Sequence, residues 1–363
     1  MRGELKTAIV LGVAIAVAIA AMSAYLSGVE SEPVVPAAPG EPIDKSGFRS
    51  APDIVGIAEY INTTPENLSR DIEGMVVLYD IWTYSCINCL RTLPFITAWD
   101  EKYSDQGLLI VGVHSPEFEF EKDPENVRAA VEKYGIEYPV VMDNDWETWN
   151  AFENRYWPRK YIADHEGYIR YDHIGEGAYQ KTEEIIQQLL AERATALNEQ
   201  MPTNGELVDI EAFQHTRSRT PELYLGYQLA FGRSQMGNDE GFRPNNIVEY
   251  TVPDTLQTHM FYMEGTWRNG PESMRLESPE GAVHLIYVAK EVNIVAAGSG
   301  TIQVYLDGEP ITPEHAGAGV DGHTVTVSES DLYNIVTSEA AGQHLLELRV
   351  SGPGVEIFTY TFG

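Results

Sequence analysis

Two cysteines, Cys86 and Cys89, are the only ones in the chain, and they come shortly after the apolar segment Met75–Trp82. A strand that gives way to a helix at such a pair places the first sulfur at a helix N-terminus. Free backbone N–H groups and a partial positive charge there favour thiolate over thiol. The first cysteine then attacks a disulfide, and the second resolves the mixed disulfide. The sequence therefore predicts a redox-active disulfide centre at Cys86 and Cys89, with no further cofactor.

Two other roles for the cysteine pair are weaker. A zinc site needs four ligands in tetrahedral geometry, and the nearby histidines His114, His165 and His173 follow no ligand spacing. A purely structural disulfide across so short a loop would add little stability. We therefore predict a redox role for the pair and no metal site.

The segments around the pair alternate between strand and helix patterns. Gly107–Val113 is a continuous apolar run, typical of a strand buried on both faces. Pro124–Tyr134 begins with proline and is followed by glycine, as helices often are. The other patterned segments are the hairpin strands Trp157–Asp164 and Tyr168–Ile174 and the closing helix Thr182–Leu197. This order predicts an α/β domain over residues 53–200, with both faces of its sheet covered.

The stretch Trp82–Pro94, with the sequence WTYSCINCLRTLP, resembles the thioredoxin fold and, within it, the membrane-linked TlpA-type and DipZ-type disulfide oxidoreductases. The resemblance covers residues 53–200 well. It covers the rest more loosely, because DipZ-type proteins also carry a β-rich C-terminal domain. It implies that Cys86 is the exposed nucleophile and that Cys89 is the resolving cysteine.

The resemblance also implies roles outside the pair. Asp80, six positions before Cys86, matches the buried carboxylate that takes and returns the proton of the resolving thiol. Pro158 matches the cis-proline that faces the cysteines and pairs with the substrate backbone. Trp82 and Tyr84 either shield the thiolate from water or fill the core. The substrate-binding candidates are Trp82, Tyr84 and Trp157.

Two departures from the family pattern limit what it implies. The dipeptide Ile87-Asn88 between the cysteines is neither the Gly-Pro of reducing thioredoxins nor the Pro-His of strong oxidants. The direction of electron flow therefore stays open. The insert His114–Asp123 is longer and more acidic than a minimal thioredoxin fold requires. We interpret it as a solvated acidic loop rather than as a segment that selects partners.

The N-terminal segment Thr7–Leu26 is uncharged, apolar and long enough to cross a bilayer as a helix. Basic residues precede it and acidic residues follow it, which predicts an inside N-terminus. A cleaved signal peptide is the alternative, because small residues lie near its end. We predict a cytoplasmic tip and transmembrane anchor over residues 1–26 and a Pro-rich linker over 27–52. The chain would be a single-pass cell-membrane protein with its bulk extracytoplasmic, where disulfides persist.

Residues 204–363 have a different pattern, with many glycines and short alternating strands such as Val283–Val288 and Leu346–Val350. Asp307-Gly308 is a two-residue hairpin signal. The spacing predicts an all-β sandwich, jelly-roll-like, after the α/β thioredoxin fold. We interpret four aromatic residues as core rather than as a sugar-binding platform. They are Tyr224, Tyr227, Tyr262 and Trp267.

The net charge of −31 argues against nucleic acid and anionic lipid as partners. We therefore predict a membrane-anchored thiol–disulfide oxidoreductase. Its partners would be protein disulfides or dithiols, with a membrane thiol reductase as the electron donor that the resemblance implies. One alternative is a peroxiredoxin-like peroxidase, since Thr83 stands three residues before Cys86. The other is a carbohydrate-binding or partner-binding surface protein with a vestigial redox domain.

Overall fold

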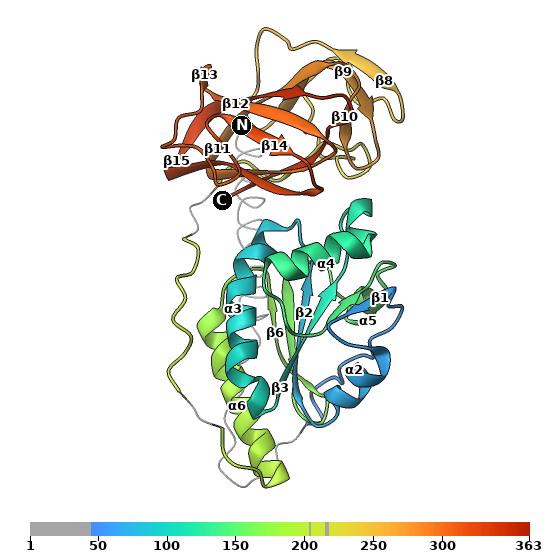
Figure 1. The fold of residues 1–363 in the computed structure, drawn as a ribbon, viewed down its shortest axis with the longest axis vertical. Helices are drawn as coiled ribbons and strands as arrows, with labels where there is room; N and C mark the ends of the chain where they lie inside the picture. The colour runs from blue at the N-terminus through green and yellow to red at the C-terminus, as the bar shows by residue number, and fades with distance from the viewer. Residues whose placement is uncertain (1–44, 203–204, 215–217) are drawn as a thin grey trace, which may run out of the picture.

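The structure, a computed structural model, describes residues 45–202, 205–214 and 218–363. An α/β domain and a β-rich domain are stacked along the long axis of the molecule (Figure 1). Within these residues, no helix is both long enough and apolar enough to cross a membrane. The predicted anchor lies outside the described residues, as does most of the predicted linker. The last part of that linker, residues 45–52, contacts the α/β domain through a bridge between Ser50 and Tyr168.

The α/β domain is built on a six-stranded sheet in the order β1-β4-β3-β2-β5-β6. Strands β2, β3 and β4 run parallel, and β5 and β6 are antiparallel additions. All seven residues of β2 are buried, and the strand lies inside the sheet between β3 and β5. Its C-terminal end therefore lies in the middle of one edge of the sheet, away from the outer strands. The strands are β1 (Glu59–Ile61), β2 (Val76–Trp82), β3 (Leu108–His114), β4 (Val140–Met142), β5 (Arg159–Ala163) and β6 (Ile169–Ile174).

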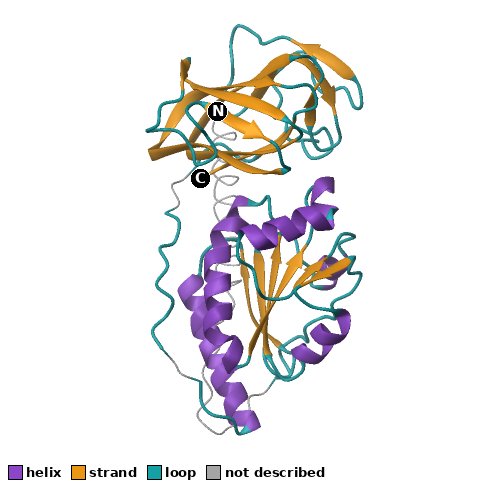
Figure 2. Ribbon diagram, in the orientation of Figure 1, coloured by secondary structure: helices purple, strands orange, loops and turns teal. Residues whose placement is uncertain are grey.

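Helices cover both faces of this sheet, as predicted (Figure 2). Alternate residues of β2 enter two separate cores, because strand side chains alternate between faces. Leu78 packs with residues of α3 and α6, and Tyr79 packs with residues of α2 and the end of α5. The helices are α2 (Pro65–Ile72), α3 (Ile87–Tyr103), α4 (Pro124–Lys133), α5 (Glu147–Ala151) and α6 (Tyr179–Leu197), with short 3-10 turns η1 (Ser104–Gln106) and η2 (Glu119–Lys122).

The C-terminal domain is β-rich, as predicted, and the named strands pair antiparallel throughout the described residues. The predicted hairpin turn is confirmed: Asp307 and Gly308 join β12 to β13 with φ angles of 53° and 88°. Both angles are positive, as the favoured two-residue hairpin turn requires. The strands are β7 (Leu223–Tyr224), β8 (Ile247–Tyr250), β9 (Phe261–Asn269), β10 (Met274–Leu276), β11 (Glu280–Ala297), β12 (Gly300–Leu306), β13 (Glu309–Pro310), β14 (Thr324–Val327), β15 (Asp331–Ser351) and β16 (Glu356–Phe362).

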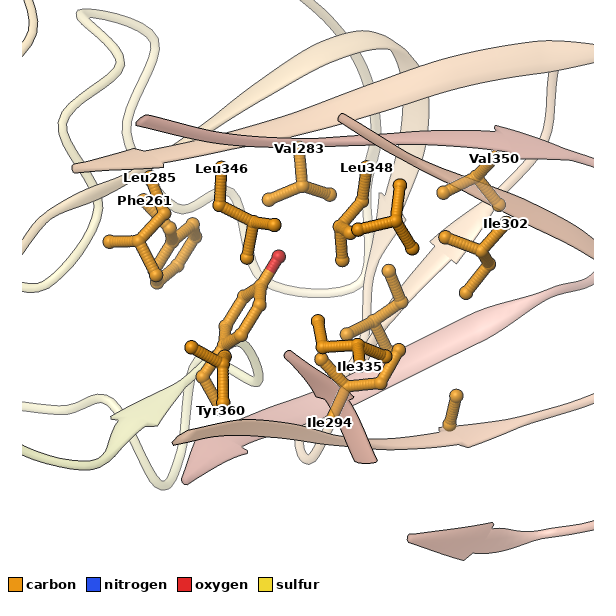
Figure 3. Close-up of a cluster of buried hydrophobic side chains, with 14 of the residues drawn as sticks. Phe261, Val283, Leu285, Ile294, Ile302, Ile335, Leu346, Leu348, Val350 and Tyr360 are labelled. Carbon is orange, nitrogen blue, oxygen red and sulfur yellow. The ribbon is translucent and has the colours of Figure 1, made fainter. Parts of the chain in front are cut away.

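Two long strands organise this domain where the sequence predicted short ones. β11 pairs with β15 along most of its length, while its first half pairs with β9 and its second half with β16. The two halves therefore contribute to two layers. Figure 3 shows Val283 and Leu348 facing Ile294 and Ile335 across the core. The jelly-roll-like order of strands stays a prediction. Tyr262 and Trp267 are buried in this domain, which agrees with a core role for both, whereas Tyr224 is buried but lines the cleft described below and Tyr227 is half-buried.

The two domains share a packed interface. Phe118 and Phe120, in the insert after β3, pack edge-to-face on Phe358 of β16, with ring centroids 5.1 and 4.9 Å apart. The backbone N–H of Glu119 donates to the Glu272 carboxylate at 2.9 Å. Because aromatic rings from both domains form one buried cluster, the β-rich domain is held against the α/β domain by apolar burial as well as by the chain connection.

A strap of residues 205–214 runs back along the α/β domain toward the β-rich domain (Figure 1). The backbone N–H of Val208 donates to the buried carboxylate of Glu183 on α6 at 2.9 Å. Gln187 donates to the carbonyl of Gly205 at 3.4 Å. The guanidinium of Arg91 lies 3.5 Å from the ring centroid of Phe213. The described part of the connection is therefore bound to the domain along its length.

Candidate active site

Cys86 is the N-cap residue of α3, immediately after the loop that leaves β2. Its Sγ accepts a hydrogen bond from the backbone N–H of Cys89 at 3.4 Å, which is one of the free donors of a helix N-terminus. Cys86 is partly exposed, whereas Cys89 is 1 % exposed. The more exposed of the two cysteines therefore lies at the N-terminal end of the helix, where the helix dipole is positive. The second sulfur lies behind it.

A buried acid and a buried base lie beneath the pair. Asp80 on β2 stands directly opposite Lys160 on β5, and both side chains are buried. Burial raises the pKa of Asp80 to about 6, against the opposing attraction of Lys160. Burial, together with the neighbouring Cys86 sulfur, raises the pKa of Cys89 well above its usual value. An acceptor that titrates near pH 6 can take a proton from a thiol that would otherwise hold it.

Lys160 was missed by sequence reasoning. Burial lowers the pKa of its ammonium, and the Nζ donates to the carbonyl of Gly175 at 3.2 Å. The signal was present: a lysine two positions after Pro158, inside a strand whose remaining residues are mostly apolar. Its strand position indicates burial by period-2 alternation, but its partner Asp80 follows only from the strand register.

The loop before β5 carries the predicted proline. The Trp157–Pro158 peptide bond is cis, as the resemblance implied. The indole Nε1 of Trp157 donates to the carbonyl of Ser115 at 2.9 Å, which fixes the ring beside the pair. Trp157 and Cys86 line the same cleft. Trp157 is therefore placed where the predicted substrate contact is possible.

Trp82 and Tyr84 lie elsewhere. Both are buried, and neither lines the cleft at Cys86. They pack around the ring of His114, with centroid distances of 5.3 Å for Trp82 and 5.7 Å for Tyr84. Burial lowers the pKa of His114 to about 3, so this ring is neutral. Their predicted contact with substrate stays a prediction, and the contacts in the structure are those of core residues.

The interpretation of the insert His114–Asp123 as a solvated acidic loop is wrong. Glu121 is fully buried, and its carboxylate accepts from the backbone N–H groups of Glu117 at 2.6 Å, Phe118 at 3.0 Å and Ser85 at 3.3 Å. Burial raises its pKa, and these hydrogen bonds oppose the shift. Glu121 therefore ties the insert to the residue that precedes Cys86. Charge patterning could not reveal this role, because the donors are backbone groups.

The β-rich domain reaches the cleft as well. The cleft has a volume of about 480 Å³, and its lining includes Cys86 from one domain and Glu222, Tyr224 and Arg233 from the other. The Tyr224 hydroxyl lies 2.6 Å from Glu117 and 2.8 Å from Glu222. The Tyr224 O–H can donate to only one of these two carboxyl groups. The carboxyl that does not accept this hydrogen bond must itself carry a proton and donate it to the Tyr224 oxygen. Burial raises the pKa of Glu117 to about 8, which fits that proton.

These features define a class of protein: a thioredoxin-fold centre in which two cysteines at a helix N-terminus, beside a cis-proline, exchange a dithiol for a disulfide. Among the described residues, no group of three or more His, Cys, Asp or Glu side chains could hold a metal ion. Family models agree with this division of the chain. Residues 50–172 match the AhpC/TSA family, and residues 220–363 match the thioredoxin-like C-terminal domain.

Curated relatives extend this assignment. The chain is 31% identical to the thiol-disulfide oxidoreductase YkuV of Bacillus subtilis over 143 residues, which are 39% of this chain and 94% of that protein. It therefore belongs to the thioredoxin-like thiol–disulfide oxidoreductases of the TlpA/DipZ type. It is also 35% identical to protein DipZ of Mycobacterium tuberculosis over 318 residues, which are 86% of this chain. The match covers 43% of that relative, so the chain spans less than half of its length. A thioredoxin-like protein solved in its oxidised form is 29% identical over 40% of this chain and 97% of its own, with a TM-score of 0.36.

Proposed function

We propose that the protein exchanges disulfides with protein substrates through Cys86 and Cys89. The Cys86 thiolate attacks a substrate disulfide, forms a mixed disulfide and releases one substrate thiolate. Cys89 then attacks the Cys86 sulfur, releases the second substrate thiolate and leaves an oxidised pair, so two electrons pass to the substrate. The reverse sequence oxidises a substrate dithiol. The observation that carries the proposal is the partly exposed Cys86 sulfur at the N-cap of α3, with Cys89 buried behind it.

Two further residues have proposed roles in this reaction. Asp80 takes the proton of Cys89 as that thiol attacks and returns it in the reverse step. The support is its burial beneath the pair and its raised pKa. Pro158 and the backbone before it present an edge to the substrate chain, beside Cys86.

Trapping of the mixed disulfide tests the proposal. We expect the Cys89→Ser variant of the full-length protein to accumulate a covalent adduct with an oxidised peptide, because the resolving sulfur is absent. Non-reducing electrophoresis and intact mass measure the adduct, and Cys86→Ser is the matched control that forms none. Adduct formation by Cys86→Ser, or its absence from Cys89→Ser, would contradict the assigned order of attack. Sustained peroxide consumption by Cys89→Ser would instead favour the peroxidase alternative.

We also propose that the protein is anchored in the cell membrane by residues 7–26, with both domains outside the cytoplasm and a membrane thiol reductase as electron donor. The apolar N-terminal segment and the charge asymmetry around it support this placement. A membrane-impermeant maleimide should label Cys86 in intact cells, because its sulfur is accessible and a donor keeps it reduced. Labelling only after permeabilisation would place the site inside. If labelling required added reductant, Cys86 would be oxidised in cells, and the proposed membrane thiol reductase would be contradicted.

A further inference from the structure

The cleft at Cys86 has one wall from each domain. In Figure 1 the N-terminal end of α3, where Cys86 lies, is directed at the β-rich domain. The cleft volume of about 480 Å³ lies within the range of roughly 300–1,000 Å³ that is typical of small-ligand sites. A folded protein partner would instead need a surface of about 800 Å² on each side. A disulfide on a short, extended peptide fits this space better than a disulfide on a folded domain.

The second wall is fixed in position. The Tyr224 hydroxyl bridges Glu117 in the insert and Glu222 in the β-rich domain, with both contacts at 2.8 Å or less. Beside this bridge, Phe118 and Phe358 pack edge-to-face. The residues that the β-rich domain contributes to the cleft are therefore held at a set distance from the sulfur.

The lining of the cleft includes two guanidinium groups, one from each domain. Arg155, from the loop before the cis-proline, donates to the carbonyl of Asn154, and Arg233 lies 4.6 Å from the ring centroid of Tyr224. Neither guanidinium forms an ion pair within 4 Å with a carboxylate of the described residues, but Arg233 is close enough to Glu117 and Glu222 for its charge to lower the pKa of both carboxyls, against the raising effect of burial. The acids Glu117 and Glu222 are already hydrogen-bonded to the Tyr224 hydroxyl. Two arginines without a direct ion pair in one cleft are unexpected for a chain with a net charge of −31.

We propose that the cleft selects acidic peptide disulfides. Arg155 and Arg233 bind carboxylates of a short peptide from opposite domains, while its disulfide meets the Cys86 sulfur. Guanidinium groups suit this task, because their paired N–H donors match the geometry of a carboxylate. The covalent step is the exchange described above, so this inference rests on the proposed function. It assigns the β-rich domain a direct part in choosing the substrate.

The test compares two small disulfides with the reduced full-length protein. Glutathione disulfide is an acidic peptide disulfide, and cystamine is a cationic disulfide that has no carboxylate. We expect Arg233→Gln to lower the second-order rate of Cys86 oxidation by glutathione disulfide about tenfold, the size expected of one charge-assisted contact. Arg155→Gln should do the same. Oxidation by cystamine should be as fast as in wild type or faster, which also reports that the variants are folded.

Arg243→Gln is the matched control, because Arg243 is an exposed arginine of the same domain and lies outside the cleft lining. We expect it to leave both rates unchanged. The preference of wild type for glutathione disulfide should also weaken as salt is raised, because screening reduces charge attraction. Equal rates with glutathione disulfide in Arg233→Gln and wild type would overturn the inference and leave exchange intact. If wild type were oxidised by neither disulfide, the proposed function itself would fail.

Discussion

Replacement of Cys86 by serine is expected to lower the rate of insulin disulfide reduction by a factor on the order of 10³ or more. A serine hydroxyl is not ionised at neutral pH and cannot form the mixed disulfide. Cys89 cannot substitute for it, because Cys89 is 1 % exposed and burial raises the pKa of its thiol. The measurement is insulin precipitation under a fixed excess of dithiothreitol, after subtraction of the rate without protein.

The matched control for this experiment is Cys89→Ser. It keeps the exposed sulfur, so in a single turnover without dithiothreitol, which would itself cleave the mixed disulfide, it should complete the first attack and then stall as an adduct. A Cys86→Ser protein that reduces insulin as fast as wild type would remove the assigned nucleophile. Cys89 would then be the one thiol left in the chain, so the activity would have to come from Cys89 or from a reaction that uses no thiol of this protein.

Replacement of Asp80 by asparagine is expected to stabilise the protein while slowing the resolving step. Burial raises the pKa of Asp80 from 3.8 to about 6. Between these two values the folded chain holds a proton that the unfolded chain has released, so the free energy of unfolding falls as the pH rises through this window. Two pKa units correspond to about 3 kcal/mol. Asparagine imitates the protonated acid, so Asp80→Asn should gain up to about 3 kcal/mol at pH 7 and progressively less toward pH 4.

The same substitution removes the proposed proton acceptor for Cys89. Resolution of a pre-formed mixed disulfide should slow by about 10²-fold, the lower end for general acid–base catalysis. Its increase with pH through about 6 should disappear. Urea unfolding followed by tryptophan fluorescence measures the first effect, and rapid acid quenching measures the second. Asp71→Asn, at an exposed surface pair with Arg70, is the control and should change neither. Stabilisation without any loss of rate would leave Asp80 a buried acid with no part in the reaction.

The sequence predicted those parts of the site that depend on neighbouring residues. The apolar run before Cys86 fixes a buried strand, and the helix that follows places the sulfur at an N-cap. Asp80 and Pro158 were predicted from the resemblance to the thioredoxin fold, in which the matching residues lie on or beside the same sheet as the cysteine pair. The turn at Asp307 and Gly308 was equally local, because its two residue types determine its backbone angles.

The remaining parts of the site depend on contacts between distant segments. Lys160 faces Asp80 only because β5 pairs with β2 in one register. Glu121 looked like one of several loop acids, and its burial depends on backbone donors that a sequence does not display. Tyr224 reaches the cleft through domain packing. The lengths of β11 and β15 in the β-rich domain were underestimated for a related reason: a strand that changes partners midway carries no sequence signal at the point of change.

The strap of residues 205–214 has a consequence for how the enzyme meets its substrates. A free tether would let the second domain swing, and the gap at Cys86 would open and close with thermal motion. Here Val208 and Gly205 are hydrogen-bonded to α6, and the ring of Phe213 lies under Arg91. The gap at Cys86 therefore keeps a set width and does not open and close. We therefore expect the proposed exchange to favour disulfides in substrate segments that are flexible or can unfold locally.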